Sequence, residues 1–252
     1  MYLTKKGQIA IFVIVAIVIV GFLVVLLVYP RIQPYIGGEV NPSAYMKQCV
    51  GQDVDKVLAV LREQGGYYSP DNYVLYKGEK IQYLCYTAEN YKPCIVQQPL
   101  LVRHVELELK SKIEPKARQC MQQLVSIYER RGYDVKSNAG ELNVIIIPSN
   151  IKIEFNSPLE LRKEGTQVFR KFGYSKDSEL YDLLLTATSI VQFESTLGDS
   201  ETSLYLQFYP DLKIEKIKRD ADTIYILSNV VSNDKFVFAT RSLVWPQGYG
   251  LS

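Results

Sequence analysis

Residues 118–135, RQCMQQLVSIYERRGYDV, contain the two patterns that decide the fold. Cys120, Leu124 and Ile127 recur at the spacing of one helix face, and Gly132 ends the pattern before residues that can form a strand. Residues 47–66 repeat this order, since KQCVGQ opens a helical pattern that ends at two glycines. The likeness fits a degenerate duplication and a chance match equally well. In both places the sequence predicts a helix followed by strands.

Most of the remaining segments show the period of strands. A helix is predicted from Pro99, kinked or interrupted at Pro115, although the alternation in residues 105–110 fits a strand nearly as well. A further helix is expected at about 178–193. The predicted strands are 73–76, 81–86, the two arms of NVIIIPSNIKIEF (143–155), 159–161, 168–172, 204–209, 223–231 and 235–240. We therefore expect an α+β domain of largely antiparallel sheet with three to four helices.

The four cysteines predict two disulfides. All four, Cys49, Cys85, Cys94 and Cys120, follow the apolar N-terminal run, and an even number is typical of an oxidising compartment. Three pairings are possible. We prefer Cys85–Cys94, which closes a short loop, and Cys49–Cys120, which joins the two similar helices. The alternative is four buried thiols. No Cys/His pattern indicates zinc, and the single histidine, His104, is expected at the surface.

Tyrosines are concentrated in residues 67–91, where seven occur. Tyrosine offers rigid contact area at binding surfaces, so this hairpin is a candidate partner-binding face. Aromatic pairs across strands can instead stabilise the hairpin itself, and this alternative is favoured. The aromatic tail around Trp245 is a second candidate. The candidate partner-binding residues are Tyr67, Tyr68, Tyr73, Tyr76, Tyr83, Tyr86, Tyr91 and Trp245.

The N-terminus carries an uncharged apolar run from Ile9 to Val28. As a helix this run would measure about 30 Å, which is the thickness of a bilayer core. We therefore expect a transmembrane helix at 9–29 in contact with the lipid bilayer. Lys5 and Lys6 precede it, which predicts a cytoplasmic N-terminus and an extracellular C-terminal domain in a single-pass protein of the cell membrane.

Lys6, Gly7 and Gln8, placed directly before the apolar run, resemble the class III signal peptide of archaeal type IV pilins and archaellins. The resemblance covers about the first 28 residues and implies cleavage after Gly7 by a prepilin peptidase. It also implies a role in assembly with pilin-like subunits. Because prolines and glycines crowd residues 30–42, the resemblance points to a minor or tip component, or to an anchored surface protein.

These signals divide the chain into five predicted parts. They are a leader at 1–8, the transmembrane helix at 9–29, a linker at 30–42, a disulfide-supported helix-hairpin-helix subdomain at 43–140 and a mixed antiparallel subdomain at 141–252. Two of the 29 basic residues precede the apolar run and all 27 acidic residues follow it, so the external part is formally neutral. A nucleic-acid partner is not expected, because it would require a basic face.

No motif for a catalytic or cofactor site occurs, so we expect no enzyme, no cofactor, no metal and no small-molecule substrate. The function indicated is that of a membrane-anchored surface protein, pilin-like or part of a surface assembly, which acts by binding other membrane or surface proteins. One alternative is an uncleaved scaffold or receptor with a partner-binding ectodomain. The other is a membrane-tethered hydrolase whose site has no known motif.

Overall fold

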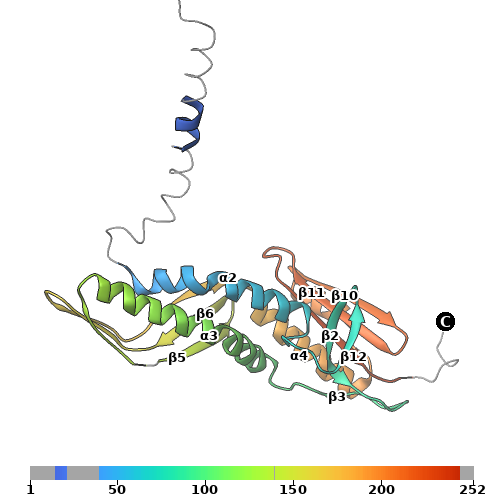
Figure 1. Cartoon of the computed structure of the whole chain (residues 1–252). Helices are drawn as coiled ribbons and strands as arrows, with labels where there is room; N and C mark the ends of the chain where they lie inside the picture. The colour runs from blue at the N-terminus through green and yellow to red at the C-terminus, as the bar shows by residue number, and fades with distance from the viewer. Residues whose placement is uncertain (1–14, 22–39, 139, 245–252) are drawn as a thin grey trace, which may run out of the picture. The chain divides into compact units, whose positions relative to one another are not determined.

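The computed structural model describes residues 15–21, 40–138 and 140–244. The chain divides into two compact units, Met1–Asn41 and Pro42–Ser252, which are treated separately here. In the first unit residues 15–21 are helical (Figure 1) and their side chains are exposed. At 1.5 Å per residue this described helix measures about 10 Å.

The predicted fold class needs a correction at the N-terminus. Among the described residues, none of the helices has both the length and the apolar character that crossing a membrane requires. The prediction of a transmembrane helix at 9–29 is therefore wrong for the part that the structure describes, since about 20 residues would be needed. The other residues of that range lie outside the described part.

The second unit contains four described helices: α2 (Pro42–Glu63), α3 (Leu101–Arg130), α4 (Leu180–Leu197) and α5 (Ser203–Phe208). Its described strands are β1 (Tyr73–Tyr76), β2 (Glu79–Tyr86), β3 (Ile95–Val96), β4 (Asp134–Ser137), β5 (Glu141–Ile147), β6 (Asn150–Asn156), β7 (Leu159–Arg162), β8 (Thr166–Phe169), β9 (Phe172–Asp177), β10 (Leu212–Arg219), β11 (Asp222–Asn229) and β12 (Lys235–Arg241).

The strands form three sheets. The largest has the order β1-β2-β12-β11-β10, with β3 paired to β2, and the smaller ones are β4-β7-β8 and β5-β6-β9. All pairs are antiparallel except β2 with β12. The expectation of an α+β domain with largely antiparallel sheet is therefore confirmed. The predicted subdomains 43–140 and 141–252 share the largest sheet, because β2 comes from one and β12 from the other.

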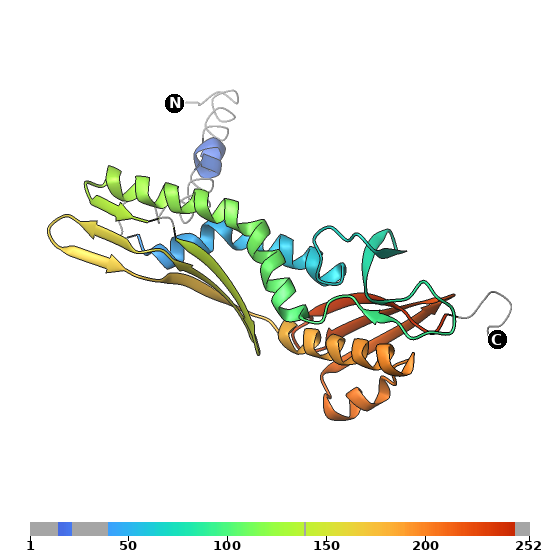
Figure 2. The same ribbon diagram turned by 90° about the horizontal axis from the view of Figure 1, so that it is seen from below.

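Helices α2 and α3 pack side by side (Figure 2) through the two apolar stripes that the sequence indicated. Their buried residues include Val50, Val54 and Leu58 in α2, and Leu109 and Leu124 in α3. Helix α3 continues through Pro115 as one element of 30 residues. It bends along its length (Figure 2), as expected where proline removes a hydrogen bond.

The two faces of the largest sheet differ in what lies on them. On one face the side chains of Ile81, Tyr83 and Ile224 belong to a cluster against which Tyr76 of the β1–β2 hairpin packs. On the other face lies α4, whose Glu194 accepts a hydrogen bond from Tyr225 of β11. Helix α4 therefore covers one face of the sheet, while the edge strand β1 extends the apolar cluster on the other face.

One sequence-based prediction is wrong near the C-terminus. The alternation of Leu204, Leu206 and Phe208 predicted a strand, but these residues form helix α5. Alternation indicates a strand when one face is buried, whereas α5 has no buried residue. The strand that lies nearby in sequence is β10, which was not predicted because lysines interrupt its apolar residues.

The structure joins Cys49 to Cys120 and Cys85 to Cys94, which is the pairing that the sequence analysis prefers. The first bond links residues 71 positions apart and fastens α2 to α3. The second links residues 9 positions apart and closes the loop between β2 and β3. The first bond therefore restricts the unfolded chain more strongly.

Replacing both Cys49 and Cys120 by alanine is expected to lower the free energy of unfolding by about 4 kcal/mol. Replacing both Cys85 and Cys94 is expected to lower it by about 3 kcal/mol, because the entropy cost of closing a loop grows with loop length. Urea denaturation of the full chain measures both. The account of the first bond as the stronger constraint is contradicted if the Cys85/Cys94 variant loses more stability.

Candidate interaction surface

The tyrosine-rich hairpin makes most of its contacts within the chain. Tyr83 is buried, its ring lies 5.1 Å from that of Tyr86, and its hydroxyl donates a hydrogen bond of 2.9 Å to Asp222. Burial, together with the bond to Asp222, raises the pKa of the Tyr83 hydroxyl above its usual value. Tyr83 and Tyr86 therefore stabilise the sheet, and Tyr86 is only partly buried.

The other tyrosines of this region also make contacts within the chain, although Tyr68, Tyr73 and Tyr91 are exposed. The Tyr67 ring lies tilted against that of His104, with 4.1 Å between the ring centroids. Lysine ammonium groups lie over three further rings: Lys112 over Tyr68, Lys80 over Tyr73 and Lys77 over Tyr76. Tyr91 is half-exposed, and its backbone N–H donates to the carbonyl of Val244. The predicted residues Trp245, Lys6, Gly7 and Gln8 lie outside the described residues.

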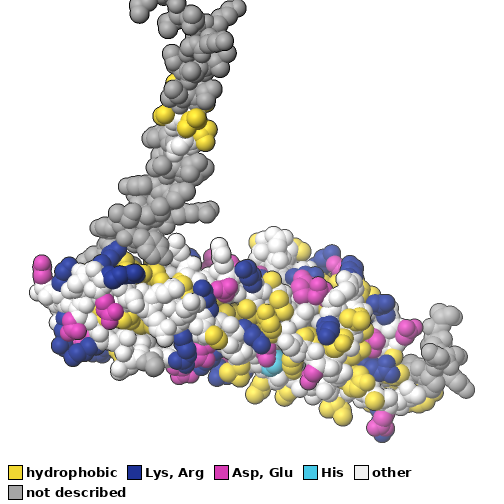
Figure 3. All heavy atoms as spheres, viewed as in Figure 1, with side chains coloured by type: hydrophobic (Ala, Val, Ile, Leu, Met, Phe, Trp, Pro, Cys, Tyr) yellow, Lys and Arg dark blue, Asp and Glu magenta, His cyan; other side chains and the backbone are white. Residues whose placement is uncertain are grey.

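His104 is half-buried beside Tyr67 and still reaches the surface (Figure 3). Burial lowers the pKa of its imidazole, and Glu108 opposes this effect. Within the described residues no group of three metal-ligating side chains occurs. Figure 3 shows hydrophobic side chains gathered near this histidine, and Ile95, Leu100 and Leu107 are among the exposed apolar residues of the β3–α3 region.

A further set of exposed apolar side chains comes from residues 185–231. Helix α4 exposes Leu185, Phe193 and Leu197, and α5 exposes three more. Single exposed apolar residues are ordinary, but several of them on two neighbouring helices make a candidate interaction site. We call this the α4–α5 surface; it consists of Leu185, Phe193, Leu197, Leu204, Leu206 and Phe208, of which Phe208 is 76% and Leu197 64% exposed.

Helix α5 is held beside α4 by polar contacts. The hydroxyl groups of Ser189 on α4 and Tyr205 on α5 lie 2.7 Å apart, within hydrogen-bond distance. Lys216 of β10 donates a hydrogen bond of 2.8 Å to the carbonyl of Ser200 and forms an ion pair with Asp199, both of which precede α5. Figure 2 shows α5 adjacent to α4 and away from α2 and α3. The apolar side chains of α5 can therefore face outward.

The start of α4 is fixed by a buried network. Asp234 accepts hydrogen bonds from the Ser178 hydroxyl, at 3.0 Å, and from the Glu179 backbone N–H. Arg62 of α2 completes the network with an ion pair of 2.8 Å to Asp234. These bonds satisfy donors at the helix N-terminus that would otherwise have no partner.

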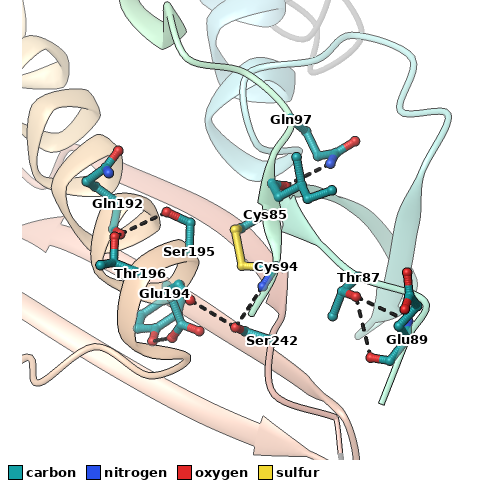
Figure 4. The surroundings of a disulfide bond; sticks show 12 residues. Cys85, Thr87, Glu89, Cys94, Gln97, Gln192, Glu194, Ser195, Thr196 and Ser242 are labelled. Atoms are coloured by element: carbon teal, nitrogen blue, oxygen red, sulfur yellow. Dashed lines mark hydrogen bonds between the residues drawn. A yellow bond between two sulfur atoms is a disulfide. The ribbon is translucent and has the colours of Figure 1, made fainter. Parts of the chain in front are cut away.

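The end of α4 is tied to the short disulfide (Figure 4). The Cys94 backbone N–H donates to the Ser242 hydroxyl at 3.2 Å, and that hydroxyl donates to the Glu194 carbonyl at 2.9 Å. Gly198 then ends the helix in the left-handed region, where its N–H also donates to Glu194. The Cys85–Cys94 bond thus supports the last turn of α4 and the apolar residues that it exposes.

The side chain of Glu194 is buried between α4 and the sheet, with 2% of the residue exposed. Burial raises the pKa of its carboxyl above the usual value. The hydrogen bond from Tyr225 and the charges of Lys216 and Lys218 act in the opposite direction, while Asp199 raises the pKa further. The Glu194 carboxyl therefore keeps its proton to a higher pH than an ordinary glutamate does.

A groove of about 330 Å³ adjoins the α4–α5 surface. Its walls come from the first half of α4, the segment from α5 to β10, and the turn between β11 and β12. The lining residues are Glu179, Asp182, Leu183, Thr186, Phe208, Tyr209, Pro210, Asp211, Leu212, Asn229, Val231 and Ser232. Both exposed apolar groups and carboxylates therefore meet at one concave site.

The chain has no detectable relatives in three comparisons: no protein-family model, no curated protein and no solved structure matches it.

Sequence reasoning missed the α4–α5 surface. The predicted stripe of α4, Leu180, Leu184, Ala187 and Val191, is buried as expected. Leu185 and Phe193 fall outside that stripe, and such surplus apolar residues on a helix indicate a second contact face. This signal is present in the sequence, although the position of α5 beside α4 is not.

Replacing Glu194 by glutamine is expected to raise thermal stability relative to the natural chain, and the difference should grow as the pH rises. A carboxyl whose pKa is raised on folding contributes stability below its unfolded pKa and loses this contribution as the pH rises through the folded pKa. Thermal unfolding of both chains between about pH 4 and pH 8 measures the difference.

Glu201→Gln is the matched control. The Ser203 backbone N–H lowers the pKa of the exposed Glu201 carboxyl, so its contribution is lost as the pH falls and its trend has the opposite sign. If the difference in unfolding temperature between Glu194→Gln and the natural chain does not change with pH, the burial argument for Glu194 is refuted.

Proposed function

We propose that the chain acts outside the cytoplasm as a protein-binding component of a surface assembly, and that the α4–α5 surface contacts its partner. The observation that carries this proposal is the group of exposed apolar side chains on two helices fixed at defined positions. A rigid apolar surface loses little conformational entropy when a partner covers it.

The two disulfides support a location in an oxidising compartment. The short disulfide also lies in the hydrogen-bonded chain that reaches the end of α4 through Ser242. Oxidation during export would therefore stabilise the part of the molecule that presents the α4–α5 surface.

The N-terminal sequence supports the same location. Lys6-Gly7-Gln8 resembles the processing site of pilin-like proteins, and we propose cleavage after Gly7 during export. Pilin-like subunits are the partners that this resemblance favours. The resemblance supports a role in assembly independently of the α4–α5 surface.

A photo-crosslinking amino acid at position 208 should capture the partner in intact cells that produce the chain. The matched control places the same amino acid at Val168, which is 55% exposed on β8 in another sheet. We expect a discrete high-mass product from position 208 and little from position 168. The intact mass of the recovered chain tests the cleavage, and the expected N-terminal residue is Gln8.

Equal yields at positions 208 and 168, or no product at either, would overturn the assignment of the α4–α5 surface. A mass that begins at Met1 would overturn the processing proposal without affecting the surface.

A further inference from the structure

The groove beside α4 combines acidic and apolar walls. Three carboxylates line it, Glu179 and Asp182 from the start of α4 and Asp211 from the segment before β10. In the part of the chain that the structure describes, none of the three forms an ion pair. No lysine or arginine lines the groove either. The charged residues that line the groove are therefore all acidic.

Helix geometry explains only part of this charge. Acidic residues at a helix N-terminus are stabilised by the helix dipole, which accounts for Glu179 and Asp182. Asp211 lies on the opposite wall and belongs to no helix. Asp211 therefore adds negative charge to the groove from a second segment of the chain. The dipole of α4 does not account for this charge, because Asp211 is not at the N-terminus of that helix.

The apolar part of the groove is accessible. Phe208 is 76% and Val231 72% exposed, and Leu183 forms part of the lining beneath them. Phe208 belongs to the α4–α5 surface, so the groove continues that surface. A partner that covers Phe208 would place its neighbouring residues beside the carboxylates.

We infer that this groove binds a partner segment in which lysine or arginine side chains alternate with apolar ones. The inference rests on the proposed function and specifies the chemistry of the partner. Apolar residues of the segment cover Phe208 and Val231, while its cationic groups lie between Asp182 and Asp211. Complementary charge of this kind gives specificity and a binding strength that falls with salt.

Binding of two short fluorescent peptides to the full chain tests the inference. One peptide alternates leucine with lysine, and the other alternates leucine with glutamate. Fluorescence anisotropy should detect the lysine peptide bound to the natural chain, with affinity falling as salt rises, and weaker binding of the glutamate peptide.

Charge reversal at the groove gives the decisive comparison. The double variant Asp182→Lys with Asp211→Lys should lower the affinity for the lysine peptide by roughly tenfold or more. It should raise the affinity for the glutamate peptide. The matched control, Glu79→Lys with Glu164→Lys, makes the same charge change at two exposed positions outside the groove and should leave both affinities unchanged. Circular dichroism tests whether each variant is folded. If the charge-reversal variant does not fold, the double variant Asp182→Asn with Asp211→Asn takes its place.

The outcomes separate this inference from the proposed function. If the control variant loses as much affinity as the groove variant, or if both peptides bind the natural chain equally, the groove does not select a cationic segment. The same holds if the lysine peptide does not bind the natural chain. In each case a high-mass crosslink at position 208 would still support the α4–α5 surface, whereas its absence would remove the proposed function itself.

Discussion

The parallel pairing of β2 with β12 is the constraint on which the rest of the second unit depends. It places Tyr83 opposite Ala239 and Cys85 opposite Thr240, so strands from distant parts of the chain share one sheet. Parallel neighbours need a long connection, and here the connection includes α3, both small sheets and α4. The pairing also brings Cys85 and its partner Cys94 to Ser242, and through Ser242 to the end of α4. The exposed face of α4 is thus fixed by contacts on its buried side.

Local patterns in the sequence were sufficient for most elements. The Cys120–Leu124–Ile127 stripe identified the second half of α3, and the Pro148-Ser149-Asn150 turn identified the β5–β6 hairpin. The preference for Cys49–Cys120 followed from the similarity of two helical segments. Each of these signals depends on residues close in sequence, or on a pair of segments with matching patterns.

The candidate surface could not be predicted, because it depends on contacts between distant residues. The hydrogen bond between Ser189 and Tyr205 places α5 beside α4, but neither residue has an unusual local pattern. The alternation in residues 204–208 even indicated the wrong element, since none of these side chains is buried. The groove joins three segments that only the β10–β11–β12 arrangement brings together. The tyrosine-rich segment was conspicuous in sequence, but its rings are largely used in intramolecular contacts.

The central claim is that α4 and α5 form a surface that is covered in the assembled state. Hydrogen–deuterium exchange of the full chain, measured alone and in the assembly isolated from cells, tests it most directly. Since α5 buries none of its residues, its amides should exchange quickly in the isolated chain. The account predicts that residues 203–211 and the exposed part of α4 become protected in the assembly, while β8 (Thr166–Phe169) is unchanged. Unchanged exchange over residues 203–211, with protection at another surface, would contradict it.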